Sequence, residues 1–504
     1  MSDENLKGAT SPAAQPDNFG KYTSSEEVVD AEKLPNNHTV DESKAFEDTS
    51  ETHFRKQGWW RGGAGSSFDA WLTTAAAQIG QVMLAMPHAV ALVGMRAAIP
   101  LIIVYSLCSM FTIHLLATLY LDYRRRMVTR GTWAGGHHKR ATQYFEVLGE
   151  LTGSKLVGWF VLAIVAISLL CTTIAQIVAI ATGMYYLAEG ESKRTWALVW
   201  GGILTVTMSM VPTFRHFRLL NIISLTGTFY TAVYLISQAG STHLPNAHQA
   251  FYQGPTKMQN LFLGANIFMS GFGGHSLAFE TIDAMYRPHR YDTVYPFSYL
   301  FTYFVTVPHS FLIQLAYPTA NEKQGNVYGA VPVNGWRDAS IVLMIIHQCV
   351  AYALYVTPVF FMWEKLIRTH HKPLWIRLPS RLPVALFVWF IALLFPFFDI
   401  INAVQGSVGY SFTAFVFPAG AYLWVYGRSS AARANAPKVP RFVGGWAPAL
   451  ALCLFIFVWF LVFGVGFGTW ASLKQLIDAV NNLGVFAACY QCAGIQATNK
   501  ANHG

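Results

Sequence analysis

One histidine directly follows a cluster of glycines inside an apolar part of the chain. The stretch NIFMSGFGGHSLAFETIDAMY contains Gly271, Gly273 and Gly274, and His275 comes next. Glycines there allow a membrane helix to unwind, and an ionisable group at membrane depth is costly and usually functional. A helix that restarts at His275 would place the imidazole beside backbone N–H groups and the positive end of a helix dipole. We therefore expect an anion site, in which protonation of His275 couples anion binding to proton binding. The alternative is a packing histidine bonded to a carbonyl.

Two carboxyl groups follow on the same stretch. Glu280 and Asp283 lie five and eight residues after His275. Either of them can carry a proton inward across the membrane. Alternatively they pair with Arg215 or Arg218 as an inner gate, or Asp283 lies at the membrane interface.

Amide side chains accompany a second interruption. Gln78 and Gln81 flank Gly80 in AAAQIGQVMLAMPHAVALVGM, and Gln176 lies in another apolar stretch. Amides can orient a ligand without adding charge, or they can join helices at about 1 kcal/mol each. The sequence leaves both roles open. Aromatic side chains such as Phe272 would suit a flat ring ligand by stacking.

The composition places these residues in a membrane protein. The 504-residue chain is 53% hydrophobic and 12% charged, whereas soluble domains carry about 25% charged residues. This excludes an ordinary soluble enzyme, a disordered chain and a coiled-coil fibre. The net charge of +9 comes from bases between apolar runs, so we expect no nucleic-acid partner. No GxxxxGK[ST], HExxH or GxSxG motif occurs, and we expect neither enzymatic activity nor a cofactor or metal.

Eleven apolar stretches are near or above the length that a helix needs to cross a bilayer, about 20 residues. We divide the nearly continuous stretch 383–426 at Gln405-Gly406, and ten spans is the alternative. This gives an all-α polytopic protein with a disordered acidic tail (1–53), a transporter domain (54–470) and a short C-terminal tail (471–504). The eleven stretches are 68–94, 97–121, 156–186, 196–212, 219–239, 259–286, 294–317, 337–367, 383–404, 405–426 and 446–470.

The basic residues predict the orientation of these spans. With the N-terminus in the cytosol, inside segments hold 27 of the 35 Lys and Arg residues, as the positive-inside rule requires. The C-terminus is then extracellular. Gly and Pro interrupt the first and the sixth span, which predicts two five-span halves with a binding site at the bilayer midplane. Asp399, inside the expected ninth span, has no assigned role.

Several motifs together resemble the AUX/LAX auxin influx carriers of plants, within the amino acid/auxin permease family. They run from about residue 59 to 492 and include DAW, FGGH, WRDASIVLMIIHQ, TPVFFMWEK and CYQC. The resemblance implies a LeuT-type fold with a five-plus-five inverted repeat and broken helices 1 and 6. It also implies proton-driven uptake of indole-3-acetic acid at the plasma membrane. The family's functional histidine falls on His275, and its glutamines fall on Gln78 and Gln81.

The sequence departs from this family at several positions. Ala77 stands where the plant proteins have Asn, and Asp283 stands where they have His. The plant proteins also have a Gly near the position of Asp399. These departures indicate a divergent member. They leave open a proton-coupled carrier of neutral or aromatic amino acids, and a non-transporting receptor or scaffold that signals through the acidic tail.

The expected transporter therefore binds its substrate through seven residues and acts as a monomer in the bilayer. The substrate site comprises His275, Gln78, Gln81, Gln176, Gly80, Phe272 and Gly274. His275, Glu280 and Asp283 are the candidates for proton coupling.

Overall fold

The computed structural model describes residues 65–132, 142–188, 190–210, 217–242, 247–252, 254–285, 287–370, 372–438, 440, 443–488 and 490. The chain divides into two units, Met1–Asp48 and Thr49–Gly504. The expected disordered tail, together with Cys489 and Cys492 of the CYQC motif, lies outside the described residues. Throughout the described part, the regular secondary structure is helical.

Seven described helices are long and apolar enough to cross a membrane, and the bent pair α2 (Ser67–Ile79) and α3 (Val82–Val93) is long and apolar enough as one unit to add an eighth. Three further expected spans coincide with helices below that length or apolarity: α7 (Lys193–Ser209), α10 (Met258–Gly271) with α11 (Ala278–Asp283), and α12 (Tyr291–Ala316). The protein is thus a multi-pass helical membrane protein. The seven are α4 (Met95–Thr129), α6 (Lys155–Leu187), α8 (Phe217–Gly240), α14 (Gly335–Leu366), α15–α16 (Leu374–Leu394), α17–η7 (Phe398–Gly427) and α20–α21 (Trp446–Leu483).

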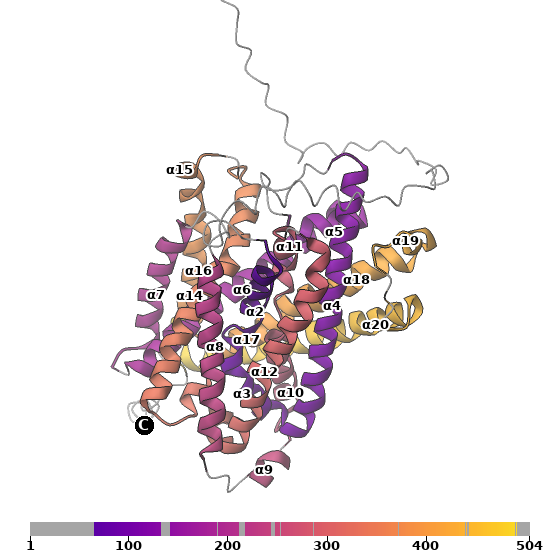
Figure 1. The fold of residues 1–504 in the computed structure, drawn as a ribbon. Helices are drawn as coiled ribbons and strands as arrows, with labels where there is room; N and C mark the ends of the chain where they lie inside the picture. The colour runs from indigo at the N-terminus through magenta and orange to yellow at the C-terminus, as the bar shows by residue number, and fades with distance from the viewer. Residues whose placement is uncertain are drawn as a thin grey trace, which may run out of the picture. The chain divides into compact units, whose positions relative to one another are not determined.

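Short helices connect the long ones. They are α5 (Tyr144–Thr152), α9 (Ala247–Tyr252), α13 (Pro318–Lys323) and α19 (Ser430–Ala434), with 3₁₀ turns η2 (His275–Leu277), η3 (Pro288–Arg290), η4 (Val327–Gly329) and η5 (Pro379–Arg381). Figure 1 shows α5 and α15 at one end of the bundle and α9 at the other.

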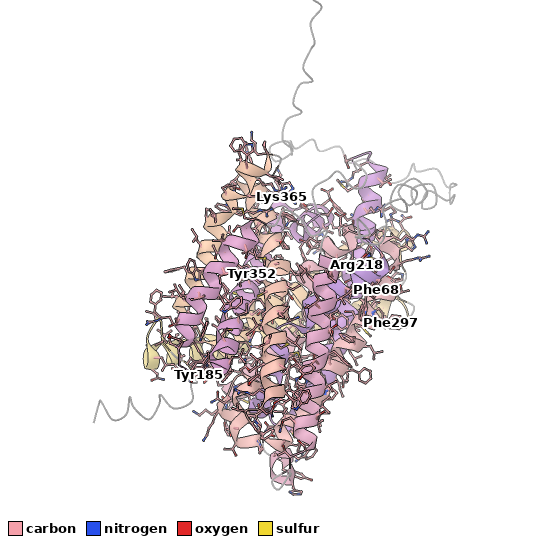
Figure 2. The ribbon with its side chains drawn as sticks, turned by 60° about the vertical axis from the view of Figure 1, so that its left-hand side comes forward. Phe68, Tyr185, Arg218, Phe297, Tyr352 and Lys365 are labelled. Atoms are coloured by element: carbon pink, nitrogen blue, oxygen red, sulfur yellow. The ribbon has the colours of Figure 1, made fainter. Side chains whose placement is uncertain are left out.

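Side-chain caps and lipid-facing side chains explain why these segments form membrane helices. Ser66 and Asp69 form a reciprocal capping box at the start of α2, and Asn334 caps α14, so the first N–H groups of these helices have partners. On α12, the Phe297 side chain is 65% exposed and points away from the bundle (Figure 2). Such large exposed apolar side chains suit a hydrocarbon environment.

The two interrupted helices run in opposite directions. Figure 1 places α2 and α11 toward one end of the bundle and α3 and α10 toward the other. Helix α2 ends at Gly80, whose φ is +37°, and the chain bends by 44° into α3. Helix α10 ends at Gly271, and Gly274 has a φ of +105°, a conformation that an L-residue rarely adopts. The predicted interruptions of spans one and six are therefore present in the structure.

The predicted boundary between spans nine and ten is wrong. Helix α16 ends at Leu394 and α17 starts at Phe398, whereas Gln405-Gly406 lies within a continuous helical segment. Pro396 explains the break, because proline lacks an N–H and disfavours helical backbone in the residue before it. As a result Asp399 lies in the first turn of α17 rather than in the ninth span. The last helix continues beyond residue 470, to Leu483.

Candidate functional site

The two helix interruptions meet at Gly274. An added Cβ on Gly274 would lie 3.3 Å from Gln78 Cγ and 3.7 Å from the carbonyl carbon of Ala77. On Gly273 it would lie 2.4 Å from Cε1 of Tyr410. The Tyr355 hydroxyl donates a hydrogen bond to the Ala77 carbonyl at the break. Only glycine allows the backbone of the second interruption to lie so close to the first.

His275 starts the resumed helix, as expected, and is fully buried. Its Nε2 lies 3.1 Å from the Ser109 carbonyl oxygen and 3.0 Å from Thr112 Oγ1. A carbonyl only accepts, so Nε2 carries the proton of the neutral ring and Nδ1 keeps its lone pair. Nδ1 has no hydrogen-bond partner among the residues described here. The ring can therefore take a second proton at Nδ1 and become a cation.

The helix that follows His275 is short. A three-residue 3₁₀ turn leads into the six-residue α11. The Leu277 N–H already donates to the Gly274 carbonyl. A helix of this length offers only a weak dipole, so the expected contribution of a long helix dipole beside His275 is absent from the described structure.

The three glutamines hold helices together around the breaks. Gln78 Oε1 accepts hydrogen bonds of 2.9 Å from Ser298 and Thr302 on α12. Gln81 Nε2 donates to Asn402 Oδ1 at 3.0 Å, and the Gln176 amide donates to Gln81 Oε1. All three glutamines are buried.

Of the amide oxygens of these three glutamines, one has no hydrogen-bond partner among the described residues. This oxygen is Oε1 of Gln176. A buried unsatisfied oxygen is costly, so Gln176 Oε1 can accept a hydrogen bond from a donor that enters this site. The glutamines therefore serve packing in the described arrangement and retain hydrogen-bonding capacity for a ligand.

Glu280 and Asp283 have different surroundings. Glu280 is 7% exposed, and neither carboxyl oxygen bonds another described residue. Asp283 is half-buried and accepts hydrogen bonds from the Tyr120 hydroxyl, at 2.5 Å, and from the Thr142 N–H, at 3.1 Å. A buried carboxyl without partners is stabilised in its protonated form, whereas Asp283 joins α11 to α4 and to the segment before α5.

The alternative in which these carboxyls pair with Arg218 is wrong. The Arg218 guanidinium forms an ion pair with Asp69 at the start of α2, with Nη2 2.5 Å from Oδ2. Arg218 and Phe68 lie close together in Figure 2. Arg215 lies outside the described residues. The attraction between Asp69 and Arg218 was missed because 149 residues separate them in the chain.

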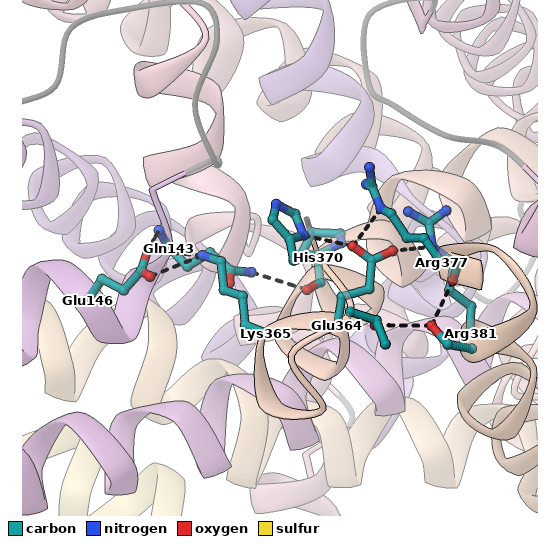
Figure 3. Close-up of polar contacts among 10 residues, drawn as sticks. Gln143, Glu146, Glu364, Lys365, His370, Arg377 and Arg381 are labelled. Carbon is teal, nitrogen blue, oxygen red and sulfur yellow. Dashed lines mark hydrogen bonds and ion pairs between the residues drawn. The ribbon is translucent and has the colours of Figure 1, made fainter. Parts of the chain in front are cut away.

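Two further ion-pair groups join short helices to the long helix α14, and Figure 3 shows both. Lys365 on α14 lies 3.1 Å from Glu146 on α5. The neighbouring Glu364 is fully buried and accepts from Arg381 at 2.6 Å and Arg377 at 2.8 Å. These contacts fix the end of α14 that lies next to α5 and α15.

The sequence of residues 63–470 matches the family model described as transmembrane amino acid transporter protein. Auxin transporter protein 1 of Arabidopsis thaliana is 37% identical over 437 residues, covering 86% of this chain and 88% of that protein. Auxin transporter-like protein 1 of Medicago truncatula is 35% identical over 449 residues, covering 88% and 91%. Auxin transporter-like protein 1 of Oryza sativa subsp. japonica is 35% identical over 438 residues, covering 86% of each.

Proposed function

This chain belongs to the transmembrane amino acid transporter family and, within it, to the AUX/LAX auxin transporters, and from that membership we propose that it imports indole-3-acetate together with protons. The family and these relatives are transporters rather than enzymes. The observation that carries the proposal is the fully buried His275 at the meeting point of two helix interruptions, with Nδ1 open to a proton.

The proposed topology has eleven spans in the plasma membrane. Spans 1–5 and 6–10 form an inverted repeat of the LeuT type, which the opposite directions of the two interrupted helices support (Figure 1). The N-terminus is cytosolic and the C-terminus extracellular, as the charge distribution indicates. The end with α2 and α11 then faces the cytosol.

His275 binds the carboxylate in this mechanism. Protonation at Nδ1 creates an imidazolium, which attracts an anion strongly in a site without water. Gln78, Gln81 and Gln176 orient the ligand, while Phe272 and the Gly80 and Gly274 breaks shape its surroundings. His275, Phe272 and the three glutamines are all buried, so a ligand reaches them only after a rearrangement of the helices. Rocking of one helix bundle against the other must open the site alternately to each side.

Glu280 carries a second proton. Its carboxyl oxygens lack partners and are buried, so it favours the neutral form until the inner side opens to water. Asp283, with its two hydrogen-bond donors, is the weaker candidate for proton coupling. Two protons moving with one anion carry a net charge of +1. A membrane potential of 100 mV, negative inside, favours the inward movement of this charge by about 2.3 kcal/mol of free energy.

The substrate is proposed to lack an amine. An amino acid would need a carboxylate or several carbonyls for its ammonium group. The single acidic residue in the sequence of span one, Asp69, lies at the end of α2 away from the break and pairs with Arg218. It is therefore not placed to bind an ammonium group at the break. A carrier of neutral or aromatic amino acids is therefore the second candidate.

Uptake of labelled indole-3-acetate in cells that express the full chain tests the proposal. We expect saturable uptake that is faster at an external pH of about 5.5 than at about 7.5, stops with a protonophore and is insensitive to unlabelled tryptophan. Competition by tryptophan would indicate the amino acid carrier instead. Absence of uptake, with the protein at the cell surface, would refute the transporter and leave the receptor.

Two variants test the proton path. Glu280→Gln should remove most of the acid stimulation while the protein still reaches the surface, because an amide cannot release a proton. Glu150→Gln is the matched control and should keep the acid stimulation, because Glu150 is not a candidate for proton coupling and its carboxylate pairs with the exposed Arg130. Equal acid stimulation in Glu280→Gln and the wild type would remove Glu280 from the mechanism.

Deletion of residues 1–53 separates the transporter from the receptor. A carrier should keep its uptake rate without the acidic tail, since every site residue lies in the helical part. A scaffold that signals through this tail would lose its function.

A further inference from the structure

One residue of α4, Ser109, binds both sides of the interruption in the sixth span. Helix α10 ends at Gly271, and the chain becomes helical again at His275. The Ser109 hydroxyl donates a hydrogen bond of 2.7 Å to the carbonyl oxygen of Phe272, which precedes Gly273 and Gly274. The backbone carbonyl oxygen of Ser109 lies 3.1 Å from Nε2 of His275, which follows them. The proposed transport mechanism does not use Ser109.

Tyr299 on α12 fixes the direction of the Ser109 hydroxyl. The Phe272 carbonyl only accepts, so the single proton of that hydroxyl points toward it. The Tyr299 hydroxyl lies 2.8 Å from Ser109 Oγ and is therefore the donor in this contact. All three residues are buried. A carbonyl that leaves a helix inside a membrane needs a partner, and Ser109 supplies one at the interruption.

Thr112, one turn further along α4, makes a second contact with the histidine. Its hydroxyl donates to the Ser109 carbonyl oxygen at 3.0 Å, so its lone pairs are free for Nε2 of His275, also at 3.0 Å. Nε2 thus faces two acceptors, a carbonyl oxygen and a hydroxyl oxygen. Of the two neutral tautomers, the one protonated at Nε2 fits both contacts. A bare Nε2 would set its lone pair against the Ser109 carbonyl oxygen.

The face of the imidazole is covered as well. Phe415, on the π-helix η6 (Gln405–Val416), lies with its ring centroid 6.3 Å from that of His275. Phe415 is stacked in turn on Phe460, with centroids 3.6 Å apart and planes 6° apart. A half-turn of the imidazole about its Cβ–Cγ bond would place Cε1 where Nε2 now lies, and both contacts with α4 would be lost. Nδ1 is left as the ring nitrogen without a hydrogen-bond partner among the described residues.

We propose that Ser109 and Thr112 are positioning residues for transport, which select the Nε2–H tautomer of His275 and leave Nδ1 for the substrate carboxylate. The tautomer follows from the geometry alone, whereas its place in transport rests on the proposed function. Both residues act through the imidazole. A ring that is already oriented needs no reordering when the anion arrives, and such preorganisation lowers the cost of binding. Loss of a positioning contact therefore weakens substrate binding more than it slows the movement of the helices.

Nitrogen-15 NMR of the purified full chain, with labelled histidine, tests the tautomer without any substrate. At about pH 8, above the ordinary pKa of an imidazole, the protonated and the bare nitrogen of one ring give well-separated signals. The signals of His275 are those that disappear in His275→Gln. We expect the proton on Nε2. A neutral His275 ring with its proton on Nδ1 would overturn the proposal.

Thr112→Val tests the positioning role in uptake assays, because it removes the hydroxyl and keeps the branched shape. We expect KM for indole-3-acetate to rise about fivefold, the effect of one lost hydrogen bond, with a smaller change in the maximal rate per surface molecule. Thr112→Ser should restore KM. The matched control is Thr118→Val on the same helix, whose buried hydroxyl donates at 3.0 Å to the His114 carbonyl of its own helix. Equal KM values in Thr112→Val and Thr118→Val would refute the role of Thr112.

Ser109→Ala removes the contact with the Phe272 carbonyl and keeps the backbone carbonyl at Nε2. The interruption is then held to Ser109 through the imidazole alone, so we expect signals of both tautomers of His275 and a raised KM. Ser106→Ala on the same helix is the control, because its hydroxyl donates only to the Ile103 carbonyl, at 2.9 Å. A wild-type spectrum and a wild-type KM in Ser109→Ala would remove Ser109 from the proposal. If the wild type takes up no indole-3-acetate, the proposed function fails, while the spectra still decide whether α4 selects the tautomer.

Discussion

Replacement of Gly274 by alanine tests whether the break in the sixth span requires glycine. Gly274 has φ +105° and ψ −5°, a left-handed backbone conformation that residues with a Cβ rarely adopt. Imposing such a backbone on an L-residue costs about 1–3 kcal/mol. The added Cβ would also lie 3.3 Å from Gln78 Cγ. Gln78 cannot move without stretching its hydrogen bonds from Ser298 and Thr302, which adds about 1 kcal/mol.

The expected loss for Gly274→Ala is therefore about 2–4 kcal/mol in the free energy of unfolding. Reversible SDS unfolding of the purified full chain measures it, and uptake assays measure the accompanying loss of transport. Gly240→Ala is the matched control, because no atom lies within 4 Å of its added Cβ and its backbone is ordinary. If Gly274→Ala were as stable and as active as Gly240→Ala, the reasoning about the break would be refuted.

Two further substitutions test the packing around the site. Glu364→Gln should cost about 3–5 kcal/mol in unfolding free energy, because it removes the carboxylate that Arg377 and the fully buried Arg381 bind. Glu150→Gln, whose partner is an exposed arginine, should cost at most about 1 kcal/mol, and similar losses would contradict this. Gly406→Ala should lower the free energy of unfolding by about 1–3 kcal/mol or more and reduce surface expression, because the new Cβ would lie 2.1 Å from the backbone carbonyl oxygen of Asn266. Wild-type thermal stability of this variant would show that the π-helical segment Gln405–Val416 can shift to make room.

The sequence predicts the membrane helices and both interruptions because these depend on local features. Long apolar stretches mark the helices, and clustered Gly marks the backbone that needs positive φ at Gly80 and Gly274. The error at the boundary of spans nine and ten has a local signal as well. Pro396 marks the end of the ninth span more strongly than Gly406 does. Gly406 lies inside a helical segment, where the lack of a side chain lets this segment approach α10 closely.

The partners of the site residues could not be predicted, because they come from distant parts of the chain. Ser109 and Thr112 bind His275 across 166 and 163 residues, and Tyr355 binds the carbonyl of Ala77 across 278 residues. Ser, Thr and Tyr are common in membrane helices, so their types carry no signal for a site. The contact of the Ser109 hydroxyl with the Phe272 carbonyl, across 163 residues, is likewise visible only after folding.

The central claim is that His275 holds the carboxylate of the transported acid. Equilibrium binding of labelled indole-3-acetate to the purified full chain at about pH 5.5 tests it most directly, with His275→Gln compared with His347→Gln. His347 is a fully buried histidine that contacts Ser224 at 2.5 Å, so it controls for the loss of a buried imidazole. We predict that His275→Gln abolishes measurable binding and that His347→Gln retains it. Wild-type affinity in a folded His275→Gln protein would contradict the account.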